Sequence, residues 1–286
     1  MNKFVSFLKN FNELVMFQHS IFSLPFIFIA MIVAADGWFG WKLLLLGALA
    51  AVTARNFAMG LNRYADRDID AKNPRTASRP SVDGRISANS ILVFTVLNAL
   101  GFIIIAYFVN SLAFYLSVPI LMVLGSYSYF KRFSALAHII LGLSLGLAPI
   151  AGVVAVQASI PLWSIFLSLG VLFWVAGFDL LYSLQDIAFD KEEGLHSIPS
   201  RFGAKNTFKI AQFFHLLTII FWYLFITQAG LNAFAYIAVV FSALMLGYEH
   251  YLVNKDFSKI DKAFFTINGY LGIIFIILII LDKALI

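Results

Sequence analysis

The sequence predicts an all-α polytopic membrane protein, a bundle of about nine transmembrane helices. Of its 286 residues, 61% are hydrophobic and only 12% are charged, whereas soluble domains carry about 25% charged residues. The apolar runs are also much longer than the roughly ten-residue strands of membrane barrels. Helices are the other structure that satisfies every backbone group in lipid. We therefore expect the chain to be embedded in the lipid bilayer.

The apolar runs define the spans in chain order, each close to the ~20 residues that cross a bilayer. They are predicted at 14–35, 41–63, 89–109, 112–130, 135–157, 162–187, 207–228, 232–252 and 263–282. Turn residues such as Asp36-Gly37, Pro161 and Gly230 separate neighbouring spans. Before the first span, residues 3–17 show the pattern of an amphipathic helix on the membrane surface.

The whole chain, 1–286, is expected to form one domain. Residues 14–134 and 135–252 look like two weakly related halves, followed by a ninth helix. Of the 20 Lys and Arg residues, seventeen fall on one side of the predicted bundle and two on the other. Basic residues concentrate on cytoplasmic loops, so we predict a cytoplasmic N-terminus.

Several kinds of chemistry are excluded or unsupported. The chain has no cysteine, which rules out disulfides and thiol catalysis. It lacks a GxxxxGK[ST] phosphate-binding loop. The net charge of +5 is ordinary for a membrane protein with basic loops, so no nucleic-acid partner is indicated.

Two acidic segments stand at the ends of the second and sixth predicted spans. Because a helical residue advances about 100°, residues four apart share one face. The segments supply two such arrays of oxygen ligands: Asn62, Asp66 and Asp70; and Asp179, Tyr182, Asp186 and Asp190. Asp68 points elsewhere and is expected to be solvated. Oxygen ligands favour a hard cation such as Mg²⁺, which also binds substrate phosphates. Structural ion pairs between helix ends are the alternative reading.

Basic residues near these segments fit a diphosphate. Arg and Lys both bind phosphate. The basic residues are Lys72, Arg75 and Arg79 after the first segment, Lys131 and Arg132 at the end of the fourth span, and Arg201 and Lys205 after the second segment. Arg55 lies inside the second span, where a charge should face a polar cavity. It is expected either to bind an anionic group of a substrate or to pair with an internal carboxylate. Four histidines, at positions 19, 138, 215 and 250, share no ligand spacing and are expected to be packed or interfacial.

These motifs resemble the UbiA superfamily of intramembrane aromatic prenyltransferases. The match covers N-x-x-x-D-x-x-x-D at Asn62 and D-x-x-Y-x-x-Q-D-x-x-x-D at Asp179, with supporting strings at 75–80, 129–132 and 194–199. The resemblance implies that Mg²⁺ and a polyprenyl diphosphate bind together. The diphosphate leaves, and the ring of a small aromatic carboxylic acid attacks the allylic cation.

The resemblance assigns roles to individual residues. Metal ligands would be Asn62, Asp66, Asp70, Asp186 and Asp190. Residues placed in catalysis are Asp66, Asp186, Tyr182 and Arg55. Substrate contacts would be Asn62, Lys131, Arg132, Arg79, Asp179 and Gln185. The implied location is a bacterial inner membrane, with the site facing the cytoplasm.

The acceptor remains open between two aromatic acids. The first is a 4-hydroxybenzoate-like acid, although many hydroxybenzoate enzymes have Asn-Asp at the start of the first motif and here Arg63 follows Asn62. The second is a dihydroxynaphthoate-type acid, because the run 54–63 also looks like the menaquinone-pathway branch. A different class, a cation-coupled secondary transporter, would place its carboxylates nearer the bilayer midplane. Here they lie at span ends beside basic loops.

Overall fold

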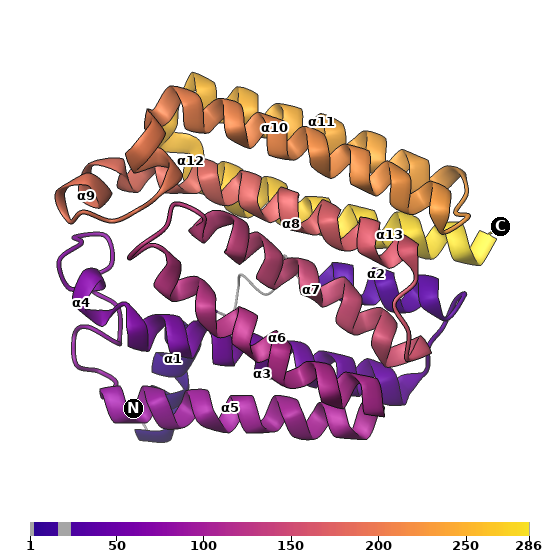
Figure 1. The fold of residues 1–286 in the computed structure, drawn as a ribbon, viewed down its shortest axis with the longest axis horizontal. Helices are drawn as coiled ribbons and strands as arrows, with labels where there is room; N and C mark the ends of the chain where they lie inside the picture. Colours follow the sequence, from indigo (N-terminus) through magenta and orange to yellow (C-terminus); the bar gives the residue numbers. More distant parts are fainter. Residues whose placement is uncertain (1–2, 17–23, 286) are drawn as a thin grey trace.

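The computed structural model describes residues 3–16 and 24–285, and its regular secondary structure there is helical (Figure 1). The principal helices are α1 (Lys3–Val15), α2 (Leu24–Ala34), α3 (Trp41–Ala65), α4 (Arg67–Asp70), α5 (Ala88–Val109), α6 (Ser111–Phe130), α7 (Ala137–Gln157), α8 (Leu162–Tyr182), α9 (Ile187–Glu192), α10 (Ile198–Gln228), α11 (Ala233–Lys255), α12 (Ile260–Lys262) and α13 (Asn268–Leu285).

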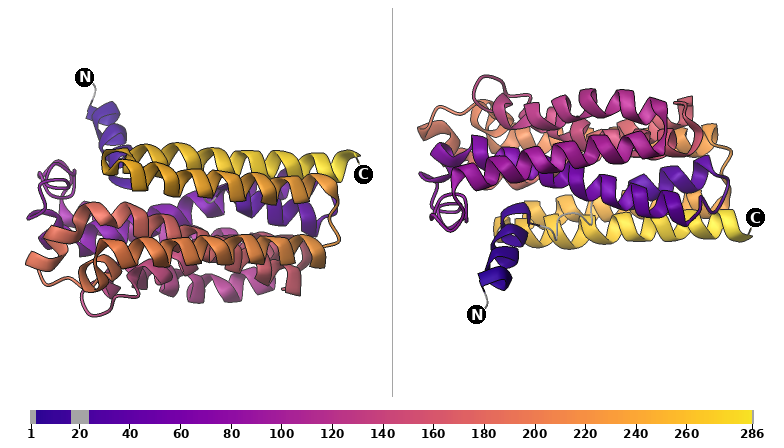
Figure 2. Two further views of the ribbon diagram at one scale, coloured as in Figure 1. Left: turned by 90° about the horizontal axis from the view of Figure 1, so that it is seen from above. Right: turned by 90° about the horizontal axis from the view of Figure 1, so that it is seen from below.

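The predicted membrane fold is confirmed. Eight helices of the described chain are long and apolar enough to cross a bilayer, and each corresponds to one predicted span from the second to the ninth. The shorter apolar helix α2 falls within the first predicted span. Residues 17–23 of that span, including His19, lie outside the described residues. The long helices run along one axis, and α1 stands at an angle to them (Figure 2).

Helix α8 is the centre of the packing, with α7 on one side and α10 on the other. Gly142 and Gly146, one turn apart on α7, face the backbone of α8 so closely that a Cβ at either position would clash with it. Small residues four apart allow two membrane helices to approach in this way. The arrangement fixes α8, whose end carries the second acidic segment.

Three local predictions were wrong. The first acidic segment is not one continuous helix, because α3 ends at Ala65 and Asp66 links it to the short α4. The second is interrupted by a 3-10 turn, Ser183–Asp186. The predicted spans 162–187 and 207–228 left residues 188–206 as a connection without regular structure, but this segment contains α9 and the start of α10. Ser197 and Ser200 cap each other's backbone groups at 3.1 and 3.0 Å, and Pro199 follows the cap, a combination that starts a helix.

The bundle end opposite α4 and α9 is held by a buried carboxylate. Asp282 is 1% exposed, and its oxygens accept from the backbone N–H groups of Asn232 and Ala235, at 2.9 and 3.1 Å. These groups lie at the start of α11, where the helix dipole also favours a negative charge. Its neighbour Lys283 donates to the exposed Asp36 at 2.7 Å.

We expect Asp282→Ala to lower the free energy of unfolding by about 1–2 kcal/mol, because it leaves two N–H groups of α11 without their acceptor. Unfolding of the purified protein in mixed micelles measures the change. Lys283→Ala is the matched control, since it removes a solvent-exposed pair and should cost far less. Equal losses for the two variants would contradict a capping role for Asp282.

Candidate active site

A polar cavity of about 270 Å³ lies at the end of the bundle that carries α4 and α9. It brings together the two acidic segments that the sequence singled out, which are more than a hundred residues apart. Its predicted site residues are Asn62, Asp66, Asp70, Arg79, Lys131, Asp179, Tyr182, Asp186 and Asp190. Thus one wall comes from the end of α3 and the following loop, and the other from the end of α8 and α9.

The first wall begins at Asn62, in the last turn of α3. Its amide donates to Asp66 Oδ2 at 2.7 Å and to Ser128 Oγ at 3.2 Å. The backbone continues with i→i−4 bonds from Asp66 to Asn62 and from Asp70 to Asp66, at 2.9 and 2.7 Å. These bonds keep the three side chains on one face although the helix is interrupted.

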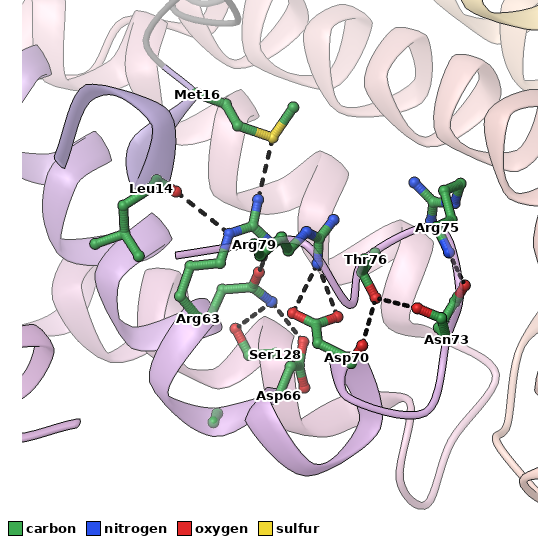
Figure 3. A network of polar contacts seen from close by, with 12 residues as sticks. Leu14, Met16, Arg63, Asp66, Asp70, Asn73, Arg75, Thr76, Arg79 and Ser128 are labelled. Carbon is green, nitrogen blue, oxygen red and sulfur yellow. Dashed lines mark hydrogen bonds and ion pairs between the residues drawn. The ribbon is translucent and has the colours of Figure 1, made fainter. Parts of the chain in front are cut away.

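Asp66 is 2% exposed, and Lys131 Nζ lies 2.7 Å from its Oδ2. Its other oxygen, Oδ1, is buried and has no hydrogen-bond partner among the described residues. Burial raises the pKa of Asp66 above its ordinary value, although Lys131 opposes the shift. One turn along, Arg79 donates to both oxygens of Asp70 at 2.7 Å (Figure 3).

The second wall is tied to the first by Arg75. Its guanidinium donates to Asp186 Oδ1 at 3.1 Å and Oδ2 at 2.6 Å, and to the Tyr182 hydroxyl at 3.3 Å. Asn73 also donates to Asp186 Oδ1, at 3.3 Å. The sequence placed Arg75 among the cations near the first acidic segment but assigned it no individual role in the site. Nothing in the sequence shows that it reaches across to a residue 111 positions away.

Two further contacts complete the second wall. Asp190 Oδ2 accepts from Ser197 Oγ at 2.7 Å. Asp179 Oδ2 lies 2.7 Å from Nδ1 of His138, the first-turn histidine of α7. His138 lines the polar cavity, which the sequence pattern did not predict. Sequence spacing cannot reveal a His–Asp pair that exists only because α7 packs against α8.

Two predicted substrate contacts do not line this cavity. Gln185 donates to Asp261 Oδ1 at 3.3 Å. Arg132 donates to the Ala65 carbonyl at 2.6 Å and to both oxygens of Asp68, at 3.1 and 2.8 Å. The bond from Arg132 lowers the pKa of the exposed Asp68 to about 2. Asp68 therefore faces away from the cavity as its helical phase predicted, and the roles of Gln185 and Arg132 stay predictions.

An apolar cavity of about 200 Å³ adjoins the polar one. Tyr127 and Leu141 line both. The rest of its wall is formed mainly by aliphatic side chains of α2, α3, α5, α6 and α7. Together the two cavities form a charged compartment at the end of the bundle and an apolar compartment deeper along the helices.

Arg55 lines the apolar cavity. Its guanidinium donates to the carbonyls of Met16 and Val15, at 2.9 and 3.3 Å, at the end of α1. Its Nε is buried without a hydrogen-bond partner, and no carboxylate of the described chain pairs with it. The internal salt bridge considered as an alternative is therefore not found among these residues, and the charge is available to an anion.

Arg63, which the sequence reading did not place in the site, is also buried (4% exposed) and lines the polar cavity. It donates to the Leu14 carbonyl at 3.3 Å, to Asn62 Oδ1 at 3.2 Å and to the Met16 sulfur at 3.1 Å (Figure 3). Together with Arg55 it fixes the end of α1, where free carbonyls carry a partial negative charge.

The donor set fits a hard divalent cation that shares its shell with a substrate. The five predicted metal ligands, four carboxylates and the amide of Asn62, all line the cavity, and the buried Oδ1 of Asp66 has no hydrogen-bond partner among the described residues. Within residues 3–16 and 24–285, no three acidic or histidine side chains form a ready-made chelating group. Mg²⁺ commonly takes only one or two carboxylates, with waters and phosphate oxygens completing its octahedron.

Comparison with known proteins gives a consistent result. Residues 23–277 match the model of the UbiA prenyltransferase family. The chain is 30% identical over 248 residues to 4-hydroxybenzoate octaprenyltransferase of Janthinobacterium sp. (strain Marseille), covering 85% of each protein.

Solved structures share the fold. A UbiA homologue from Aeropyrum pernix K1 superimposes with a TM-score of 0.84 at 30% identity, over 92% of this chain and 98% of that one. A UbiA homologue from Archaeoglobus fulgidus bound to DMAPP and Mg²⁺ has a TM-score of 0.77 at 20% identity, over 97% and 100% of the two chains. With the family model covering most of the sequence, the chain belongs to the UbiA prenyltransferase family and is a membrane prenyltransferase.

Proposed function

We propose that this enzyme transfers a polyprenyl group from polyprenyl diphosphate to the ring of a small aromatic acid, with Mg²⁺, in quinone biosynthesis. The observation that carries the proposal is the junction of two cavities at Tyr127 and Leu141. A diphosphate needs a charged chamber and its prenyl tail needs an apolar one. The reacting C–O bond would then lie at the boundary between them.

The polar cavity contains matched sets of charges for the diphosphate. Lys131, Arg79 and Arg75 are each bonded to one aspartate of the site. When substrate binds, we expect these cations to turn to phosphate oxygens and the carboxylates to hold the metal. Mg²⁺ would neutralise the charge that grows on the leaving diphosphate. The DMAPP and Mg²⁺ bound by the Archaeoglobus fulgidus homologue support this use of the fold.

The apolar cavity would receive the prenyl chain and keep water from the allylic cation. Tyr182, whose hydroxyl is held by Arg75, would line the side of the reacting carbon. Arg55 would bind the carboxylate of the acceptor, since its charge has no acidic partner in the described chain. The ring would thereby be placed at the junction.

The curated relatives favour a 4-hydroxybenzoate-like acceptor. A dihydroxynaphthoate-type acid is the alternative within the same chemistry, and its carboxylate would use the same Arg55. The concentration of Lys and Arg at the cavity end supports a position at the cytoplasmic face of a bacterial inner membrane.

The test is an assay of the purified protein in lipid nanodiscs. Octaprenyl diphosphate is supplied with 4-hydroxybenzoate or with a dihydroxynaphthoate, and products are identified by mass spectrometry. We expect prenylated hydroxybenzoate, complete loss of product with EDTA and recovery when Mg²⁺ is restored. Product from the naphthoate alone would assign the other branch. If neither acid gives a metal-dependent product and the protein instead drives cation-coupled uptake of a solute into liposomes, the alternative of a secondary transporter would be favoured.

A further inference from the structure

The proposed reaction needs a base. When the ring carbon of the acceptor forms its bond to the prenyl carbon, that ring carbon still carries its hydrogen, and aromaticity is lost. We propose that His138, oriented by Asp179, is the catalytic base that removes this proton. The inference rests on the proposed function and adds a residue that neither acidic motif contains.

The two side chains form a hydrogen-bonded dyad inside the polar cavity. His138 Nδ1 and Asp179 Oδ2 are 2.7 Å apart, with 7% and 22% of the side chains exposed. An ionised Asp179 accepts the Nδ1 proton, which leaves the lone pair of the imidazole on Nε2. A carboxylate that holds a histidine in one tautomer and stabilises its protonated form is the arrangement that makes imidazole an effective base.

The free nitrogen needs a partner. Nε2 of His138 is buried and has no hydrogen-bond partner among the described residues. Buried polar atoms are nearly always bonded, and an exception at a site calls for an explanation. A bound substrate would provide one, since the ring lines a cavity rather than packed core.

His138 also lies at the right depth. It precedes Leu141 on α7 by about one turn of 5.4 Å, and Leu141 borders both cavities. On the opposite wall, Arg55 lines the apolar cavity and Asn62 the polar one. An acceptor whose carboxylate is held at Arg55 therefore presents the far edge of its ring towards the junction and His138.

The other carboxylates of the cavity have side-chain partners in this structure and would hold the metal when substrate is bound. Asp66, Asp70 and Asp186 are each bonded to a cationic side chain, and Asp190 accepts from Ser197. A second histidine pair, His215 and His250, is buried among α8, α10 and α11 and lines neither cavity. The dyad is thus the remaining base that reaches the cavity within the described chain.

The step balances without any added reagent. The C–H bond at the substituted ring carbon breaks, and its electron pair restores the aromatic sextet. The proton passes to Nε2, giving an imidazolium paired with the Asp179 carboxylate. Loss of that proton to solvent or to the departing diphosphate returns the dyad to its starting state.

The test uses an acceptor deuterated at the ring positions that become prenylated. If C–O cleavage limits the wild-type rate, the full enzyme shows an isotope effect near unity. We expect His138→Gln to lower kcat by about a hundredfold and to reveal a primary isotope effect, because proton removal becomes limiting. Asp179→Asn should also lower kcat and reveal a primary isotope effect. The exposed His196→Gln carries the same substitution outside the cavity and should behave as wild type.

Three results would overturn the proposal. The first is full activity of His138→Gln. The second is a folded His138→Gln enzyme that is slow but shows no isotope effect. The third is a shift in the Mg²⁺ concentration at which His138→Gln reaches half its maximal rate, because such a shift would show that His138 supports metal binding. If His138→Gln does not fold in micelles, Asp179→Asn gives the same readouts. An inactive wild-type enzyme would refute the proposed function instead, so the two failures are distinguishable.

Discussion

Asp66→Ala and Asp186→Ala are each expected to reduce kcat about a hundred- to a thousandfold at ordinary Mg²⁺ concentration, while the protein stays folded. Each substitution removes a carboxylate from one wall of the polar cavity. The leaving diphosphate then loses part of the charge stabilisation that is effective in a water-excluded site. Initial rates across a Mg²⁺ titration measure the effect, and higher Mg²⁺ should restore part of the activity.

Asp68→Ala is the matched control for these two variants. Asp68 lies two residues from Asp66, but its carboxylate is exposed and bonded to Arg132 outside the cavity. Its removal should change kcat by no more than a few-fold. An inactive Asp68→Ala enzyme, or an Asp66→Ala enzyme with wild-type rate, would show that the two walls have been assigned incorrectly.

Arg55→Met should raise the KM for the aromatic acid about 10- to 100-fold, the loss expected for charge-assisted hydrogen bonds. The KM for polyprenyl diphosphate should stay near its wild-type value, because the cations around the polar cavity remain in place. Steady-state kinetics with each substrate varied in turn separate the two constants. A methyl ester of the acceptor carries no carboxylate charge and should be used equally by both enzymes.

Arg55 also holds the end of α1, so a second variant is needed to isolate its effect on the acceptor. Arg85 binds α1 as well, through Glu13 at 2.6 and 2.8 Å, but it lines neither cavity. Arg85→Met should loosen α1 and leave the KM for the acid unchanged. The same rise in KM for both variants would assign Arg55 to the position of α1 rather than to the acceptor.

The parts of this structure that the sequence predicted are those governed by short-range periodicity. Apolar runs of bilayer length located the long helices, and the four-residue spacing of Asn62, Asp66 and Asp70 placed them on one wall. Gln185 was placed in the site by the family motif and not by this spacing, and its role stays a prediction. The 3-10 turn at Ser183–Asp186 winds more tightly, at three residues per turn, and Gln185 contacts Asp261 instead of the cavity.

Contacts made by tertiary packing could not be predicted in this way. The dyad of His138 and Asp179 depends on how closely α7 approaches α8. Arg63 was read only as a sign of the acceptor branch, yet it is buried against the carbonyl of Leu14. The dyad and the Arg63 contact both depend on distances between helices that are remote in the sequence, and a single sequence does not give those distances.

The ion pairs of the polar cavity have a thermodynamic consequence. A metal ion arriving alone would take carboxylates away from Arg75, Arg79 and Lys131 and leave those cations repelling one another. A diphosphate arriving alone would take the cations away from the aspartates and leave those carboxylates repelling one another. Each ligand thus removes the electrostatic penalty of the other, so their affinities are linked reciprocally. The enzyme would rest in a self-compensated state and load its cation and its pyrophosphate ester as a cooperative unit.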